Sequence, residues 1–286
     1  MSRSEVVDGA PATRGQGRSR WTARVASSRP VLLQILGFCL AVALWELFAR
    51  YKGITVPTPG AVVTDVRDNF VNSAYLEAHN FGSGYWYDIL YTTKNVLLGV
   101  SLGTAAGVSL GLISIPFPLV SQVLNPIAAT FGAAPIFVAA PFFLIWFGVV
   151  ATAQVLMVTF YTALLLYIFS RRAAENVPAE YVESAWTLGA GGFEVFRSIY
   201  VPGTVPELIG GFRIALAGAW GLEAIAELLG AQHGVGFLIN YYAAVFGMVG
   251  MVTLTLLLGC VAIVFDGLAM LGARALLRWT DTGYVI

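Results

Sequence analysis

Residues 89–115 read ILYTTKNVLLGVSLGTAAGVSLGLISI. This apolar run is longer than the roughly 20 residues that a helix needs to cross the hydrocarbon core of a bilayer, so it predicts a transmembrane helix. Four glycines recur within it at a strict spacing of four, which places them on one helix face. Small residues at this spacing favour close packing against a second helix. The four positions are Gly99, Gly103, Gly107 and Gly111.

The composition of the whole chain agrees with a membrane protein. Of its 286 residues, 58% are hydrophobic and 11% are charged, whereas about 25% of the residues of a soluble domain are charged. Sixteen Lys and Arg balance sixteen Asp and Glu, so the net charge does not indicate a nucleic-acid partner. Apolar runs of spanning length predict an all-α integral membrane bundle of six transmembrane helices. These runs are 31–49, 89–115, 126–147, 151–169, 206–229 and 246–276.

The charges outside the spans predict the domain limits and the orientation. Six arginines mixed with Ser, Gly, Ala and Pro indicate a disordered basic tail over residues 1–30. The six-span domain then covers 31–279, and 280–286 form a short C-terminal tail. The positive-inside rule places both tails in the cytoplasm and the loop 50–88 outside. A secretory signal peptide is the alternative for the N-terminus, but no small-residue cleavage site follows the first apolar run.

The third predicted span contains Pro135 and Pro141. Proline inside a helix removes a backbone hydrogen bond and clashes with the preceding turn. We therefore expect this span to be kinked or partly unwound at these positions. Broken helices line the pathway in some transporters, whereas in other proteins a kink serves only packing.

A polar stretch, ENVPAEYVESAWTLGAGGFEVFRSIYVP, occupies residues 175–202 between the fourth and fifth spans. Pro178 suits the first turn of a helix, and Gly189 supplies a left-handed stop. The pattern predicts two short helices, and in the first of them Ala185, Trp186 and Gly189 share one face. A short amphipathic helix with small residues has a shape that fits a cleft in another protein.

The same stretch resembles the EAA motif of ATP-binding-cassette (ABC) importer permeases. The resemblance rests on Glu183-Ser184-Ala185, on Gly189 after three intervening residues, and on Ile199-Tyr200-Val201-Pro202 after nine more. Ser184 and Val201 replace the usual Ala and Leu. In that family the loop is a coupling helix that docks on the ATP-binding subunit, which implies docking through the loop 171–205. The implied docking residues are Glu183, Ser184, Ala185, Trp186, Gly189, Ile199 and Pro202.

Further stretches resemble the nitrate, sulfonate and taurine branch of these permeases. The resemblance covers 31–279 and implies the six-helix fold of a type I ABC importer permease, which carries a small, anionic or heterocyclic, organic solute. Lys94, the lack of basic residues in 116–122 and the long stretch 72–88 depart from the branch, so the substrate stays open. The matching stretches are Val56-Pro57-Thr58-Pro59, Leu144-Ile145-Trp146-Phe147-Gly148, Ala226-Glu227, Gly234-Val235-Gly236 and Arg278-Trp279.

The resemblance also implies the partners. They are two ATP-binding subunits on the cytoplasmic side that hold ATP and Mg, a second permease copy or paralogue, an extracytoplasmic solute-binding protein and the lipid of a bacterial inner membrane. No phosphate-binding Gly-Lys-Ser/Thr loop is present, so the ATPase is expected on a separate chain. His79 and His233 stand without neighbours at metal-ligand spacing, and we expect no metal, no cofactor and no catalytic residue on this chain.

Arg213, Glu223 and Glu227 lie in the fifth span, where a charge is costly and is usually turned inward and paired. Glu223 and Glu227 are one turn apart. Arg213 lies about 15 Å before Glu223 along the helix, so it cannot pair with either glutamate. The three residues are candidates for lining the translocation path. Structural pairing with another span is the alternative.

The leading functional prediction is a non-catalytic permease subunit that couples transport to ATP hydrolysis on partner chains. A secondary transporter or channel without an ATPase partner is the alternative, and it would be expected to show inverted repeats and more ionisable groups near the midplane. A membrane-embedded enzyme would need a nucleophile with a base, or a metal cluster. We find neither pattern in the sequence.

Overall fold

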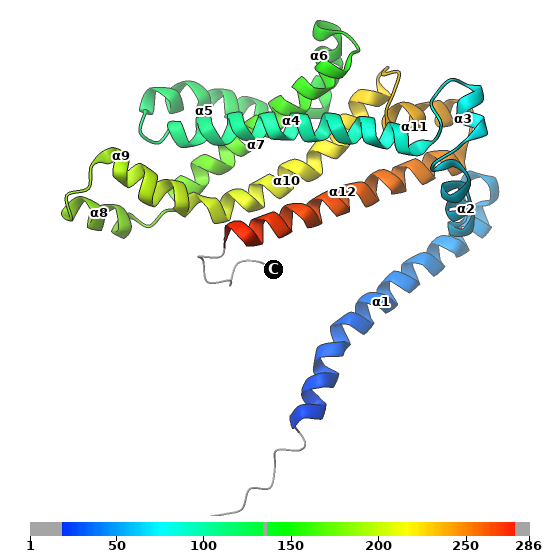
Figure 1. Cartoon of the computed structure of the whole chain (residues 1–286), viewed down its shortest axis with the longest axis horizontal. Coiled ribbons are helices and arrows are strands. Elements are labelled where there is room, and N and C mark those ends of the chain that lie inside the picture. The colour runs from blue at the N-terminus through cyan, green and yellow to red at the C-terminus, as the bar shows by residue number, and fades with distance from the viewer. Residues whose placement is uncertain (1–18, 134–135, 278–286) are drawn as a thin grey trace, which may run out of the picture. The chain divides into compact units, whose positions relative to one another are not determined.

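The computed structural model describes residues 19–133 and 136–277, and it is helical without a strand over those residues (Figure 1). The predicted all-α class is therefore confirmed. The chain divides into two compact units, Met1–Gly60 and Ala61–Ile286, and we describe each unit by itself.

The first unit contains the helix α1 (Ser19–Lys52) and the short 3₁₀-helix η1 (Gly53–Thr55). Its apolar part is long enough to cross a membrane. The indole N–H of Trp45 donates to the carbonyl of Pro57 at 3.0 Å and holds the chain after η1 back against the helix. Helix α1 includes residues 19–30, which the sequence assigned to a disordered tail, because neither Gly nor Pro interrupts residues 19–29. Residues 1–18 and 280–286 lie outside the described residues.

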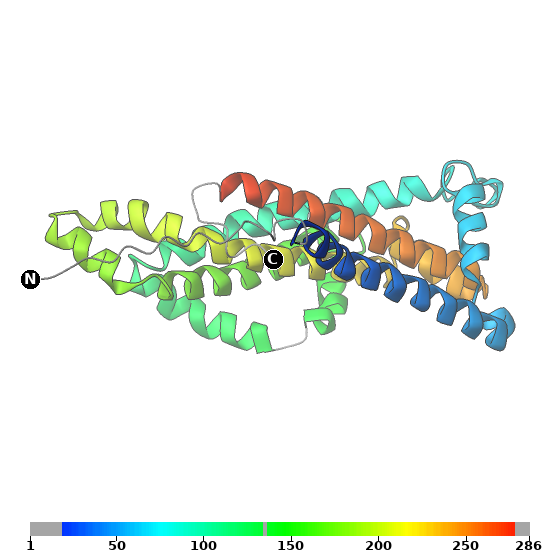
Figure 2. The ribbon, with the colours of Figure 1, turned by 90° about the horizontal axis from the view of Figure 1, so that it is seen from below.

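The second unit is a bundle in which α4 packs along α7, α7 along α10, and α10 along α12 (Figure 1, Figure 2). The pair of α4 and α7 is the most extensive contact in the bundle. The short helices α3 and α11 lie at one end, and α8 and α9 lie at the other. The helices are α2 (Pro59–Asn69), α3 (Ala74–Ala78), α4 (Tyr85–Ile113), α5 (Pro118–Ala133), η2 (Ile136–Ala139), α6 (Ala140–Phe147), α7 (Ala151–Glu175), α8 (Ala179–Thr187), α9 (Gly192–Val195), η3 (Phe196–Tyr200), α10 (Val201–Leu228), α11 (Val235–Ala244) and α12 (Met248–Leu276).

The number of spanning helices agrees with the sequence once a bent pair is counted as one span. Among the described residues, five helices are long and apolar enough to cross a membrane. The sixth is the predicted third span, in which Pro118–Gly132 and Phe137–Phe147 are bent by 89° relative to each other. Pro141 lies in the first turn of α6, where proline is tolerated, and Pro135 lies outside the described residues. The expected break in this span is therefore present.

The glycine stripe of α4 is buried against α7. A Cβ atom on Gly99 would lie 2.6 Å from the side chain of Val158, and one on Gly103 would lie 2.7 Å from the carbonyl oxygen of Thr159. Contacts this short with side-chain and backbone atoms leave no room for a methyl group. The absent side chains therefore set the distance between the two helices. The same holds for Gly107 and Gly111.

We expect Gly107→Ala to destabilise the bundle, because its new methyl group would meet the backbone of Ala163. Overpacking of this kind costs about 1–3 kcal/mol. The thermal unfolding midpoint of the purified chain should therefore fall by several degrees. Gly259→Ala on α12 is the matched control, because nothing lies within 4 Å of its added Cβ. Equal midpoints for the two variants would contradict the packing role of the stripe.

Candidate functional site

The polar segment 176–200 folds into two short helices and a π-helix, η3, which we call the α8–α9 element. Helix α8 ends in a hydrogen-bonded stop. Gly189 has a φ of +86°, in the left-handed region that favours glycine. Its N–H donates to the carbonyl of Trp186 at 2.9 Å, and the N–H of Ala190 donates to the carbonyl of Ala185 at 3.0 Å. This pair of bonds is a Schellman motif, and it satisfies the last carbonyls of α8.

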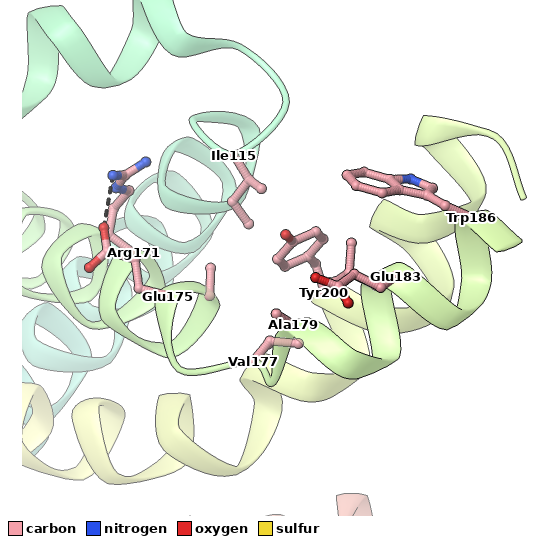
Figure 3. Close-up of a pocket in the computed structure, with 10 residues that line it drawn as sticks. Ile115, Arg171, Glu175, Val177, Ala179, Glu183, Trp186 and Tyr200 are labelled. Carbon is pink, nitrogen blue, oxygen red and sulfur yellow. Dashed lines mark hydrogen bonds and ion pairs between the residues drawn. The ribbon is translucent and has the colours of Figure 1, made fainter.

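Two hollows flank α8. The first has a volume of about 360 Å³, and Trp186 and Tyr200 point into it beside Glu183 (Figure 3). Its far wall carries the ion pair of Arg171 and Glu175 from the end of α7. The second hollow has a volume of about 320 Å³ and lies between α8 and α9. It is lined by Ala185, Gly189 and Ile199, among others.

The predicted docking residues therefore do not form a single face, because they lie on different sides of α8. Glu183 and Trp186 line the first hollow, whereas Ala185, Gly189 and Ile199 line the second. Ser184 is exposed on α8, outside the lining of both hollows. Pro202 is half-buried in the first turn of α10.

Large apolar side chains are exposed on the α8–α9 element, although the segment as a whole is polar. Val182 and Val195 anchor it, with exposed fractions of 7% and 3%. Exposed apolar and aromatic groups gathered in this way are typical of surfaces that contact another protein or a membrane. The exposed side chains are Tyr181, Trp186, Leu188 and Phe193.

A second feature lies toward the opposite end of the bundle, where six polar side chains from three helices are buried together. Each has an exposed fraction of 3% or less. We call this group the buried polar cluster. It consists of Asp88, Thr92 and Asn95 on α4, Gln154 on α7, and Glu223 and Glu227 on α10.

The carboxylates of the cluster hold the start of α11. Glu227 accepts the N–H of Gly236 at 2.8 Å on one oxygen and the hydroxyl of Thr92 at 2.7 Å on the other. Asp88 accepts the N–H of Gly234 at 2.7 Å, and the intervening amide donates to the Thr92 hydroxyl oxygen at 3.0 Å. The first amides of a helix lack intrahelical partners and carry its positive dipole end. Side chains of α4 and α10 therefore supply the hydrogen-bond acceptors that the first amides of α11 lack within their own helix.

The rest of the cluster joins α4, α7 and α10. The side-chain amide of Asn95 donates to Glu223 at 2.9 Å and to Gln154 at 3.0 Å. Tyr91 also donates its hydroxyl to Gln154, at 3.3 Å. Glu223 and Glu227 thus have the pairing with other helices that the alternative interpretation expected. Their part in a translocation path stays a prediction.

The remaining candidate path residue, Arg213, pairs with a residue of α12. Arg213 donates from Nε and Nη2 to the two oxygens of Asp266, at 2.8 Å and 2.7 Å. Such a bidentate pair fixes both side chains and is stronger than a single bond. The two side chains are 36% and 38% exposed. Sequence reasoning separated Arg213 from the two glutamates correctly, but it did not find this partner, which lies 53 residues away in the chain.

Sequence reasoning also missed most of the buried polar cluster. Asp88, Thr92 and Asn95 follow the spacing i, i+4, i+7 at the start of an apolar helix, and this polar face is the signal that could have found them. Gln154 stands alone in its span and gives no such signal. Among the described residues, no group of three or more His, Cys, Asp and Glu is placed to hold a metal ion.

The family described as binding-protein-dependent transport system inner membrane component matches residues 99–278. The taurine transport system permease protein of Escherichia coli strain K12 is 25% identical over 78% of this chain and 80% of its own length. The riboflavin transport system permease protein of Chloroflexus aurantiacus is 27% identical over 94% and 95%. The fold resembles a chain of the MetNI methionine ABC transporter in an inward-facing conformation, with a TM-score of 0.55, 18% identity, and coverage of 66% of this chain and 94% of that one.

We expect Glu227→Ala to lower the stability of the purified chain, because it leaves the Gly236 amide and the Thr92 hydroxyl without their acceptor. Each buried polar group without a partner costs about 1–3 kcal/mol. Thermal unfolding measures the loss, with Glu77→Ala at an exposed position of α3 as the control. Glu227→Gln should keep more of the stability, since its side chain can still accept from Gly236. An unchanged midpoint for Glu227→Ala would show that the cluster does not hold α11.

Proposed function

Because this chain belongs to the family of binding-protein-dependent transport system inner membrane components, we propose that it is the permease subunit of an ABC importer. In this role it forms the translocation path for a small solute and performs no covalent chemistry itself. ATP and Mg²⁺ are held by two partner subunits. A second permease copy or paralogue completes the path, and an extracytoplasmic solute-binding protein delivers the solute. Family membership and the matched relatives support this assignment.

The observation that carries the coupling role is the exposed apolar surface of the α8–α9 element. Trp186 is 60% exposed and Leu188 is 88% exposed, on a short helix held rigidly by Val182 and the Gly189 stop. Tryptophan is among the residues most enriched at interface hot spots. The element lies within the part of the chain that matches the family. It is therefore the surface on which the ATP-binding subunit docks.

The orientation follows from the arginines near the same end of the bundle. Arg197 lies in η3, Arg171 and Arg172 lie near the end of α7, and Arg274 lies in the last turn of α12. Basic residues flanking spans favour the cytoplasmic side. The α8–α9 element then faces the cytoplasm, and α3 and α11 lie on the outer side, where the solute-binding protein arrives.

The solute class is proposed as a small, anionic or heterocyclic, organic molecule. The named relatives transport taurine, a small sulfonate, and riboflavin, a heterocycle. Arg213, Glu223 and Glu227 remain the candidates for the path. The pairing of Arg213 with Asp266 leaves about a third of each side chain exposed, so this ion pair is the more accessible of the candidates.

Replacing the exposed tryptophan tests the docking role. Trp186→Ala removes a large contact without disturbing the core, so we expect the ATP-binding subunit that co-purifies with the chain to decrease at least about tenfold. Trp146→Ala is the matched control, because this tryptophan is 72% exposed on α6. Retention of the ATP-binding subunit by Trp186→Ala at the level of the control would reject the docking surface.

Cysteine labelling tests the orientation separately. In a background where Cys39 and Cys260 are replaced by alanine, Glu77→Cys on α3 should react with a membrane-impermeant maleimide in intact cells. Glu194→Cys on α9 should react only after the inner membrane is opened. Both native glutamates are exposed, so both cysteines are reachable from their own side. The reverse labelling pattern would place the α8–α9 element outside and exclude it as an ATPase contact.

A further inference from the structure

A third hollow lies between α5 and the last two turns of α7, with a volume of about 540 Å³. We call it the Arg172 pocket. Asn125 and Ala128 line it from α5, and Ile168, Arg171, Arg172 and Glu175 line it from α7. It is separate from the hollow beside Trp186, although Arg171 and Glu175 line both.

The charges in this pocket do not balance. Arg171 is 2.9 Å from the carboxylate of Glu175 and 3.5 Å from both the carbonyl and the hydroxyl of Ser114, so its charge is already matched. Arg172 has no side-chain hydrogen bond or ion pair within the part of the chain that the structure describes, and it is exposed. Two guanidinium groups against one carboxylate leave an excess of one positive charge. A basic residue in the last turn also offsets the helix dipole, but the adjoining cavity lets this one contact a ligand.

The remaining lining selects the kind of ligand. The hydroxyl of Tyr167 donates to the side-chain carbonyl oxygen of Asn125 at 2.7 Å, and the NH₂ group of the same amide is left to donate to a ligand. Ala128 and Ile168 form an apolar wall beside these donors. Guanidinium and amide donors next to an apolar wall fit an oxyanion attached to a short or long alkyl group.

We propose that the Arg172 pocket binds an oxyanion, that is a phosphate, sulfonate or carboxylate group, with Arg172 as its principal partner. Two sources offer this chemistry at the end of a spanning helix. One is the headgroup of an anionic phospholipid, since basic pockets between transmembrane helices bind such headgroups. The other is a solute in transit. Only the second source rests on the proposed function, so the pocket can bind an oxyanion even if the transport assignment fails.

An anion bound in the pocket would also affect the α8–α9 element. Arg171 and Glu175 line both the Arg172 pocket and the hollow that contains Trp186 and Tyr200, and Figure 3 shows their ion pair beside that hollow. An oxyanion in the pocket competes with Glu175 for Arg171, and a released carboxylate would stand beside the hollow of α8. The pocket therefore offers a direct route by which a bound anion changes the docking surface.

Binding measurements on the full-length chain, purified in the assembly that it forms, test the proposal. In one arm the protein is placed in phosphatidylcholine nanodiscs with an increasing fraction of phosphatidylglycerol. In the other arm sodium sulfate or 2-aminoethanesulfonate is added to pure phosphatidylcholine nanodiscs, with sodium chloride at equal ionic strength as the reference. The shift in thermal unfolding midpoint gives an apparent affinity in each arm, and the arm that responds identifies the source.

Arg172→Ala should weaken the responding anion about fivefold to tenfold, as expected for the loss of one guanidinium contact. Glu175→Gln should strengthen it, because it removes the competing carboxylate. Arg274→Ala, at the exposed end of α12, is the matched control and should leave the affinity unchanged. The proposal is overturned if no anion shifts the midpoint of the wild-type protein in either arm. It is also overturned if Arg172→Ala and Arg274→Ala have equal effects, because the response would then come from surface charge in general.

Discussion

The fold depends on one constraint, which is that a polar group buried among apolar helices must find a partner inside the protein. In hydrocarbon no water replaces a missing hydrogen bond, and each unpaired group is costly. The buried polar cluster meets most of this constraint by pairing side chains of α4, α7 and α10 with one another and with the first amides of α11. One carboxylate oxygen of Asp88 and one of Glu223 are buried without a hydrogen-bond partner among the described residues. The directional bonds of the cluster specify one arrangement of helices, whereas apolar packing alone tolerates several.

One long helix joins the buried polar cluster to the α8–α9 element at the other end of the bundle. The α9 helix, η3 and α10 form one continuous helix, Gly192–Leu228, about 55 Å long at 1.5 Å per residue. It begins in the α8–α9 element and ends at Glu223 and Glu227. The side chain of Asn176 also donates to Glu207 at 2.9 Å and ties the end of α7 to the same helix. Under the proposed docking role, this helix would connect the α8–α9 element to the buried polar cluster at its far end. The π-helical turn of η3 is the place where that helix is locally irregular, as is common at functional sites.

Local features were predictable from the sequence, whereas most tertiary partners were not. Six spans, a break near Pro141 and the stop at Gly189 each follow from composition or backbone chemistry within a few residues. The partner of Arg213 lies on another helix, and a single sequence contains no information on which helix packs beside it. The same limit concealed the bonds of Glu227 to α4 and α11. The predicted disordered tail, 1–30, overlaps α1, which begins at Ser19. Its composition is typical of disorder, but residues 19–29 contain neither Gly nor Pro to interrupt a helix.

The most direct test of this account is the hydrogen–deuterium exchange of the backbone amides of Gly234, Val235 and Gly236 in the membrane-embedded protein. These amides open a helix, where exchange is ordinarily fast because they lack intrahelical partners. Each is bonded here to a buried side chain of the cluster. The account predicts protection comparable to the middle of α4 and α10. Exchange within seconds, at the rate of an ordinary helix start, would contradict the claim that the cluster holds these helices together.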